Sequence, residues 1–186
     1  MRAIPFYLPQ FHTIPENNAF WGEGFTEWTN VKAAERLFND HDQPKVPHDD
    51  IGYYDLLEGS VMEKQERMAQ TYGIYGFAYW HYWFGNGKTV LEKPLQIKLD
   101  NKSLILPYCL AWANESWTGK WHGLEDEVIV EQSYPGTDDY IAHFEYLLPH
   151  FRDERYIKVD GKPIFIVNKP FEIPSEDEFV ETFREQ

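Results

Sequence analysis

Two indoles, an amide and a carboxylate follow one apolar run near the middle of the chain, from Trp112, Asn114, Glu115 and Trp117. The run, residues 104–111, reads Leu-Ile-Leu-Pro-Tyr-Cys-Leu-Ala and is apolar enough for a strand buried on both faces. Indole rings suit the C–H faces of a sugar, and amides and carboxylates bind its hydroxyl groups. A carboxylate beside an indole can have its pKa raised by desolvation, which makes Glu115 a candidate acid catalyst. The alternative is that both tryptophans are core residues and Glu115 begins a loop or caps a helix.

A second stretch, residues 76–85, shows the same change from apolar to aromatic residues and reads Gly-Phe-Ala-Tyr-Trp-His-Tyr-Trp-Phe-Gly. Alternation along a strand points Tyr79 and His81 to one side and Trp80 and Tyr82 to the other. One set can therefore face a cleft while the other packs. His81 lies at the carboxyl end of the predicted strand, where barrel enzymes carry site residues, although a structural histidine is the alternative.

The segment of residues 13–57 is rich in proline, glycine and aromatic residues and has little periodicity. A loop of this length in a compact domain is usually functional or disordered, and its aromatic content argues against disorder. We therefore expect it to fold over a site, with Glu23, Glu27 and Trp28 as candidate polar and stacking residues. Alternatively, Trp21 and Trp28 pin the segment to the rest of the fold.

The elements that must position these residues alternate between strands and helices. Strands are expected at residues 3–8, 76–85, 104–112 and 162–168, and helices at 58–72, 89–99, 138–151 and from 175. A hairpin turn is predicted at Asp160-Gly161 and a capping box at Ser175-Glu-Asp-Glu. This order implies one α/β domain, residues 1–186, with a parallel sheet and right-handed crossovers. Four such units are half of a TIM-type (β/α)₈ barrel, which typically needs ~250 residues.

The composition limits the classes of partner. The formal net charge of −14 opposes binding to nucleic acid. The sequence contains no run of about 18 apolar residues, so membrane insertion is not expected. Aromatic residues make up 17% of the chain, more than packing requires, so some are expected to line a binding surface.

The lone cysteine and the scattered histidines predict no cofactor and no metal. Cys109 lies inside the apolar run, so it is interpreted as a packing residue, and a chain with one cysteine forms no internal disulfide. The seven histidines form no His-Glu-x-x-His or similar ligand spacing. The chain starts with a strand and shows no export signal at its beginning, so a cytoplasmic location is expected.

Four segments together resemble the WbsX family of bacterial proteins, often called lipopolysaccharide-biosynthesis glycosyltransferases and similar to glycoside hydrolase family ninety-nine. The segments are Tyr7-Leu-Pro-Gln-Phe-His12, Trp21-Gly-Glu-Gly-Phe-Thr-Glu-Trp-Thr-Asn-Val31, residues 76–84 and Trp112-Ala-Asn-Glu-Ser-Trp117. The resemblance runs from residue 3 to about residue 170. It implies a (β/α)₈ barrel and action on cell-surface or other polysaccharides, and the similar hydrolases are retaining endo-mannosidases.

The resemblance also implies a set of site residues. If a carboxylate of these residues takes part in the chemistry, Glu115 is the first candidate, because Asn-Glu at a barrel strand end also resembles the acid/base site of many other barrel glycosidases, and Glu27 is the second. The expected substrate-binding wall comprises Tyr7, Gln10, His12, Trp28, Trp80, His81, Trp112, Asn114 and Trp117. In the family, a Trp-Asn-Glu-Trp-x-Glu-Gly type motif late in the chain supplies the two carboxylates closest to the chemistry. These 186 residues contain no such motif, so none of them inherits those roles. We therefore expect the amino-terminal half of the barrel, with a carboxyl-terminal half or another domain completing it.

Three functions remain open from the sequence. The first is a glycosidase-like enzyme, which needs an acid and a second carboxylate at a separation that sequence does not give. The second is a glycosyltransferase of lipopolysaccharide or O-antigen biosynthesis, although no glycine-rich loop joins a strand to a helix as nucleotide binding would favour. The third is a glycan-binding chain without catalysis.

Overall fold

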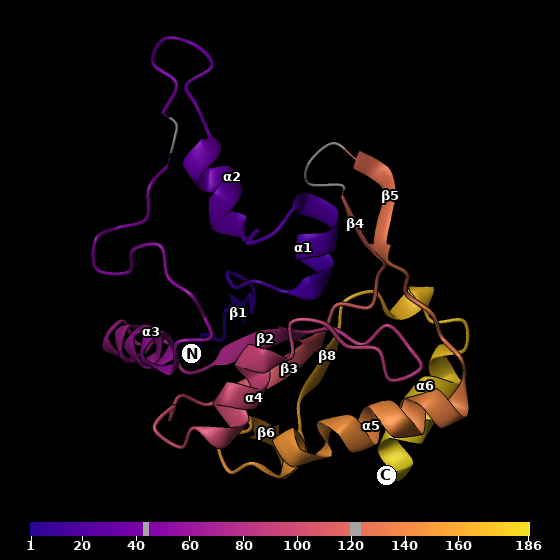
Figure 1. Ribbon diagram of the computed structural model, residues 1–186. Helices are drawn as coiled ribbons and strands as arrows, with labels where there is room; N and C mark the ends of the chain where they lie inside the picture. Colours follow the sequence, from indigo (N-terminus) through magenta and orange to yellow (C-terminus); the bar gives the residue numbers. More distant parts are fainter. Residues whose placement is uncertain (43–44, 120–123) are drawn as a thin grey trace.

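The centre of the fold is a four-stranded parallel sheet, seen in the computed structural model, which describes residues 1–42, 45–119 and 124–186 (Figure 1). Its strands, in the spatial order β1-β2-β3-β8, are β1 (Phe6–Tyr7), β2 (Phe77–His81), β3 (Tyr108–Trp112) and β8 (Phe165–Val167). Each neighbouring pair is parallel. The predicted α/β class with a parallel sheet is therefore confirmed.

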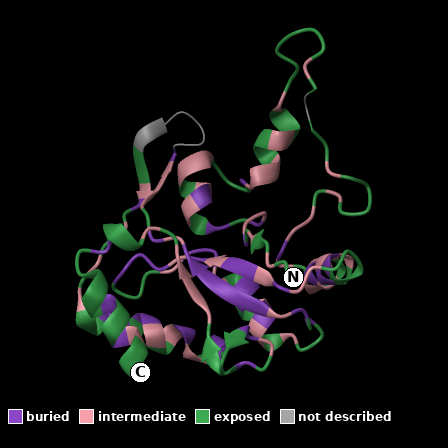
Figure 2. Cartoon of the chain, turned by 180° about the vertical axis from the view of Figure 1, so that it is seen from behind, coloured by how far each residue is buried: buried purple, intermediate pink, exposed green. Residues whose placement is uncertain are grey.

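Four helices link and cover these strands at the places where the sequence predicts helices. They are α3 (Gly59–Thr71), α4 (Lys93–Asp100), α5 (Thr137–Arg152) and α6 (Glu176–Glu185). Met62, Leu95 and Leu147 pack from three of them against Tyr79 and Leu110 of the sheet. Alternate strand residues point to opposite faces, so this packing defines the helix-covered face. Figure 2 shows the buried residues concentrated between the sheet and these helices.

The opposite face of the sheet carries the other set of alternate residues. Phe6 is 58% exposed, and its ring stacks on that of Trp80 at 4.7 Å and 7°. Ala111 lies beside Trp80 in the register of β2 and β3. This face is therefore lined with aromatic and small residues. Figure 1 shows α1, α2 and the β4–β5 hairpin above the sheet, on the side away from α4, α5 and α6.

The segment of residues 13–57 contains two short helices that the sequence interpretation missed. They are α1 (Pro15–Trp21) and α2 (Glu27–Ala33). Proline is tolerated at the first helical position of α1, and Thr26 caps α2 through a reciprocal bond with Thr29. Both helices are too short to show the apolar periodicity on which the prediction relied.

Several predicted element ends are corrected by the structure. Strand β1 covers two residues instead of six, because Pro5 and Pro9 flank it and proline cannot donate to a ladder. Helix α4 begins at Lys93, which places Pro94 in its first turn, where proline is accepted. Ser175 precedes α6 but makes no side-chain cap hydrogen bond, so the predicted capping box does not form.

Two antiparallel hairpins complete the described elements. Strands β6 (Lys158–Val159) and β7 (Lys162–Pro163) flank the predicted turn, where Asp160 and Gly161 both have positive φ, as in a tight hairpin turn. Strands β4 (Trp117–Gly119) and β5 (Leu124–Val130) form the second hairpin directly after the β3 segment. A short 3₁₀ helix, Pro170–Glu172, follows β8.

A buried ion pair ties α3 and α4 to the segment that leads into β3. Lys98 Nζ lies 2.5 Å from Glu66 Oε1 and also donates to the carbonyls of Leu104 and Leu106. Glu66 Oε2 accepts from the backbone N–H of Leu106. Every polar group in this cluster thus finds a partner, which is what makes a buried charge tolerable.

Cys109 occupies the packing position that the sequence predicts. Its side chain is buried in β3, and burial raises the pKa of its thiol to about 11. The thiol therefore stays protonated and unreactive at neutral pH. No helix among the described residues has the length and apolar character needed to cross a bilayer.

Candidate functional site

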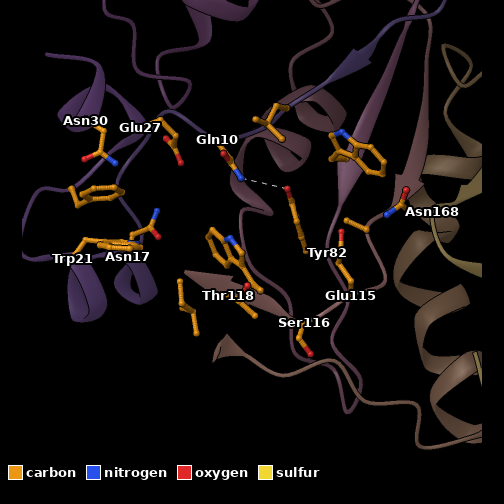
Figure 3. Close-up of a pocket in the computed structure, with 16 residues that line it drawn as sticks. Gln10, Asn17, Trp21, Glu27, Asn30, Tyr82, Glu115, Ser116, Thr118 and Asn168 are labelled. Carbon is orange, nitrogen blue, oxygen red and sulfur yellow. Dashed lines mark hydrogen bonds between the residues drawn. The ribbon is translucent and has the colours of Figure 1, made fainter. Parts of the chain in front are cut away.

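A cavity of about 620 Å³ lies at the carboxyl ends of the strands, between the sheet, the two short helices and the β4–β5 hairpin. This volume is typical of sites that hold a ligand of drug or disaccharide size (about 300–1,000 Å³). Its wall mixes aromatic rings, amides and two carboxylates. The lining residues are Leu8, Gln10, Asn17, Trp21, Phe25, Glu27, Asn30, Trp80, Tyr82, Ala113, Glu115, Ser116, Trp117, Thr118, Ile129 and Asn168. Figure 3 shows the polar side chains turned toward the space between them.

Glu27 is the desolvated carboxylate of this cavity. It opens helix α2, and its Oε2 accepts a hydrogen bond of 2.6 Å from the backbone N–H of Phe11. Burial raises the pKa of Glu27, while the backbone hydrogen bonds from Glu27 itself and Phe11 act in the opposite direction. Phe11 has φ of +66°, a left-handed conformation that is uncommon for a bulky residue. The backbone after β1 is therefore bent so that it meets Glu27.

Glu115 has a different environment from the one that the sequence interpretation assumed. Its side chain is 49% exposed, and its Oε2 lies 2.9 Å from Nζ of Lys169. Lys169 also pairs with Glu172 at 2.9 Å, and these two acids raise the pKa of the lysine. The expected desolvation of Glu115 beside an indole is thus absent. The structure shows an ion pair with a lysine ammonium there instead.

The two carboxylates have different environments in one cavity. Glu27 is partly buried and accepts a backbone hydrogen bond, and burial raises its pKa, whereas Glu115 is 49% exposed and forms an ion pair with Lys169. Two acids in different environments are a common basis for separate acid and base roles in one site.

Gln10 and the aromatic rings form the wall between the two acids. Gln10 Nε2 lies 3.5 Å from the hydroxyl of Tyr82, and burial raises the pKa of that hydroxyl, so it remains a hydrogen-bond donor. The ring of Tyr82 stacks against Trp117 at 6.1 Å and 26°. Trp80 adds a further indole from β2. These flat surfaces beside polar groups suit the apolar faces of sugar rings.

Five of the predicted site residues line the cavity, and six do not. Those that line it are Gln10, Glu27, Trp80, Glu115 and Trp117. The six whose side chains lie elsewhere are Tyr7, His12, Trp28, His81, Trp112 and Asn114.

Strand alternation explains three of the six. Tyr7, His81 and Trp112 belong to the set that points to the helix-covered face. Tyr7 donates to Gln65, and Trp112 donates to the carbonyl of Trp83 at 2.9 Å. These side chains fill the core below the site instead of binding a ligand in the cavity.

His81 is fully buried and pairs with a second histidine from α5. Its Nε2 lies 2.8 Å from Nε2 of His143, and burial lowers the pKa of His81 to about 3 and that of His143 well below its ordinary value. Both imidazoles are therefore neutral, and one donates to the other. The alternative interpretation of a structural histidine fits this geometry.

The remaining three also make contacts within the fold. Trp28 donates from Nε1 to the carbonyl of Tyr54 at 2.7 Å. His12 is 0% exposed and faces the carbonyl of Gln10 at 3.4 Å. Asn114 is also 0% exposed, and its amide bonds the backbone of Lys169 in both directions at 2.8 Å. Asn114 therefore holds the segment that carries the lysine partner of Glu115.

The sequence interpretation missed several lining residues. Tyr82 could have been chosen from the alternation of residues 79–83, because it lies on the same side as Trp80. Asn17 and Trp21 come from α1, which gave no periodic signal.

Among the described residues, no group of three histidine, cysteine, aspartate or glutamate side chains has the arrangement to hold a metal ion.

Comparison with known sequences gives one family and two close relatives. The family model described as "Glycosyltransferase WbsX" matches residues 3–186. Proteins named WxcX from two strains of Xanthomonas campestris pv. campestris are 43% identical over 171 residues, which are 92% of this chain and 24% of theirs. The chain thus spans about a quarter of the length of these curated relatives.

Comparison with solved structures gives GH99 endo-alpha-mannosidase from Bacteroides thetaiotaomicron. One structure, in complex with BIS-TRIS-propane, matches with a TM-score of 0.53 and 14% identity over 91% of this chain and 42% of the mannosidase chain. A second matches with a TM-score of 0.52 and 14% identity over 92% and 46%. At this identity the likeness concerns the fold alone, and it covers less than half of each mannosidase chain.

Proposed function

The chain belongs to the WbsX glycosyltransferase family, whose members are carbohydrate-active, and from this premise we propose that its cavity binds a polysaccharide and acts on one of its glycosidic bonds. The polysaccharide is a cell-surface or related glycan in this proposal. The observation that carries the proposal is a partly buried Glu27, whose pKa is raised by burial, in one aromatic-walled cavity with a Glu115 that is paired with Lys169. A cytoplasmic location remains a prediction from the sequence.

The proposed architecture is the first four β/α units of a (β/α)₈ barrel. The parallel order β1-β2-β3-β8 with helices on one face supports it, and so does the partial match to the mannosidase chains. In this proposal a carboxyl-terminal half or another domain supplies the remaining units. That partner segment covers the face that carries Phe6 and Trp80.

The proposed roles of the two acids follow from their environments. Glu27, whose pKa is raised, keeps its proton longer than an ordinary glutamate and donates it to the glycosidic oxygen. Glu115, which forms an ion pair with Lys169, stabilises the positive charge that develops on the sugar or activates water. This assignment exchanges the order in which the sequence ranked the two residues.

The proposed binding wall consists of Gln10, Trp80, Tyr82 and Trp117. The rings pack on the C–H faces of the sugar, while Gln10 and the protonated Tyr82 hydroxyl bond its hydroxyl groups. The formal net charge of −14 makes the chain unfavourable for an anionic ligand. This favours a neutral glycan over the diphosphate of a nucleotide-sugar donor.

The competing functions are glycosyl transfer, which the family name favours, and glycan binding without catalysis. One assay separates hydrolysis, glycosyl transfer and binding without catalysis. The chain is incubated with neutral polysaccharides, with and without nucleotide-sugar donors, and new reducing ends are measured. The proposal predicts reducing ends without any donor. Strict dependence on a donor supports transfer, and binding by titration without turnover supports the binding function.

Two variants tie the result to the site. Glu27→Gln removes the proposed acid, and general acid catalysis contributes about 10²–10⁴-fold, so turnover is expected to fall by that factor. Glu23→Gln is the matched control, since Glu23 is an exposed glutamate four residues away that does not line the cavity. Equal turnover in both variants contradicts the role of Glu27.

A further inference from the structure

Asn17 is a buried amide whose nitrogen makes no hydrogen bond to the described residues. It lies on α1, is 2% exposed and borders the cavity. Its Nδ2 is buried and has no partner within the described part of the chain. The amide of its neighbour Asn18, in contrast, bonds both Glu23 and the backbone of Gly24.

A buried donor without a partner is uncommon, because it loses its bonds to water on folding and gains none in return. Replacement by an apolar residue of similar volume would remove that cost. An unsatisfied amide at the edge of a cavity is therefore expected where a ligand supplies the missing acceptor. Since Nδ2 only donates, the ligand must offer a hydroxyl or carbonyl oxygen at this point.

The side chains around Asn17 limit the class of ligand further. The rings of Trp21 and Phe25 lie 5.5 Å apart at 24° and form an aromatic surface that borders the same cavity. The formal net charge of −14 on the chain disfavours a negatively charged group. A neutral molecule with an apolar face and an acceptor oxygen fits these surroundings. A sugar ring has both.

The position of Asn17 within the cavity separates it from the proposed acid–carboxylate pair. Figure 3 shows Asn17, Trp21 and Asn30 at one end of the cavity and Glu115 and Asn168 at the other. Gln10 and Tyr82 lie between the two ends in the same view. The cavity thus has room and polar groups at two places along its length.

We propose that the end of the cavity formed by Asn17, Trp21 and Phe25 is a second saccharide subsite, which binds a neutral sugar ring adjacent to the ring held between Gln10, Tyr82 and Glu115. Asn17 Nδ2 donates to an oxygen of that ring, and the ring packs on Trp21. The inference rests on the proposed function of the cavity. It implies that the chain selects a segment of at least two sugar rings over a single monosaccharide.

The test is calorimetric titration of the 186-residue chain with three series of ligands. Each series is a monosaccharide and its disaccharide: mannose with α-linked mannobiose, and the corresponding glucose and N-acetylglucosamine pairs. In at least one series the wild type is expected to bind the disaccharide more tightly than the monosaccharide. Asn17→Leu keeps the branching of the side chain and removes the donor, so disaccharide affinity is expected to weaken about tenfold while monosaccharide affinity stays unchanged. Asn17→Ala should show the same loss if the leucine does not fit.

Thermal unfolding without saccharide separates a binding role from a structural one. Asn17→Leu is expected to melt at the wild-type temperature or higher, because it removes an unsatisfied buried donor. Asn39→Leu, at an exposed asparagine in the same segment, is the control for the exchange itself. A lower melting temperature for Asn17→Leu together with wild-type disaccharide affinity overturns the subsite and assigns Asn17 to the fold.

The failure of the subsite and that of the proposed function give different results. If disaccharide affinity is independent of Asn17 while Glu27→Gln still abolishes turnover, the subsite is wrong and the function stands. If the wild type binds no saccharide in any of the three series, both are wrong.

Discussion

Asn114 provides a sharp test of how the carboxyl ends of β3 and β8 are held together. Its side chain makes three hydrogen bonds, to the N–H and the carbonyl of Lys169 at 2.8 Å and to the hydroxyl of Tyr134 at 3.1 Å. All three disappear in Asn114→Ala. The same change also loosens the backbone that presents Lys169 to Glu115.

The magnitude follows from the number of bonds and the burial of the site. A typical internal hydrogen bond contributes about 0.5–1.5 kcal/mol, so three give about 1.5–4.5 kcal/mol. Since Asn114 is 0% exposed, water cannot easily replace the lost partners. We expect the free energy of unfolding to fall by about 2–4 kcal/mol.

Urea unfolding followed by circular dichroism measures this change. The control is Asn168→Ala, at an exposed asparagine that lines the cavity at the end of β8. Its free energy of unfolding is expected to stay within about 0.5 kcal/mol of the wild type. If Asn114→Ala is as stable as this control but binds saccharide more weakly, Asn114 contacts the ligand and the structural role is refuted.

Further predictions concern the buried polar groups and the tight packing of the sheet. Lys98→Met leaves the Glu66 carboxylate buried without its lysine partner, so the free energy of unfolding by urea should fall by about 3–5 kcal/mol. Replacing both residues by methionine should restore most of that loss. A Lys98→Met variant as stable as the wild type contradicts the prediction. The pKa of His81 is lowered to about 3, so the folded state binds its proton less well than the unfolded state. The contribution of this histidine to the free energy of unfolding is therefore fully present above pH 6.5, its ordinary pKa. It decreases as the pH falls below 6.5, by up to about 1.4 kcal/mol per pH unit, and unchanged urea midpoints between pH 7 and pH 5 would refute this. Gly76→Ala would place its Cβ in steric overlap with the carbonyl oxygen of Pro107, so the free energy of unfolding is expected to fall by about 1–3 kcal/mol in the same assay. An unchanged midpoint would mean that the backbone at Pro107 moves aside freely.

The sheet and its helices could be predicted because their sequence signals are local. The apolar run before Trp112 and the alternation of residues 76–85 each identify a strand without knowledge of its neighbours. The helix at Gly59–Thr71 follows from its own composition and from Gly73 after it. These signals gave the parallel α/β arrangement in the right order.

The identity of the site residues depended on contacts that no local pattern contains. Alternation separated His81 from Trp80, but the sequence does not state which side the helices cover. Glu115 was ranked first because of its position after a strand, whereas its salt bridge comes from Lys169, over fifty residues later. Glu27 is desolvated because α2 packs near the bend at Phe11, and neither feature was visible as periodicity.

Glu27 is proposed to be the acid of a cavity that binds saccharide, and ¹³C NMR titration of its carboxyl group tests this most directly. Glu27→Gln identifies the signal. Because burial raises the pKa of Glu27, we expect a midpoint above the ordinary value of 4.5 and a change in that midpoint when a neutral disaccharide is bound. A midpoint at or below 4.5 that does not respond to a saturating disaccharide would contradict it.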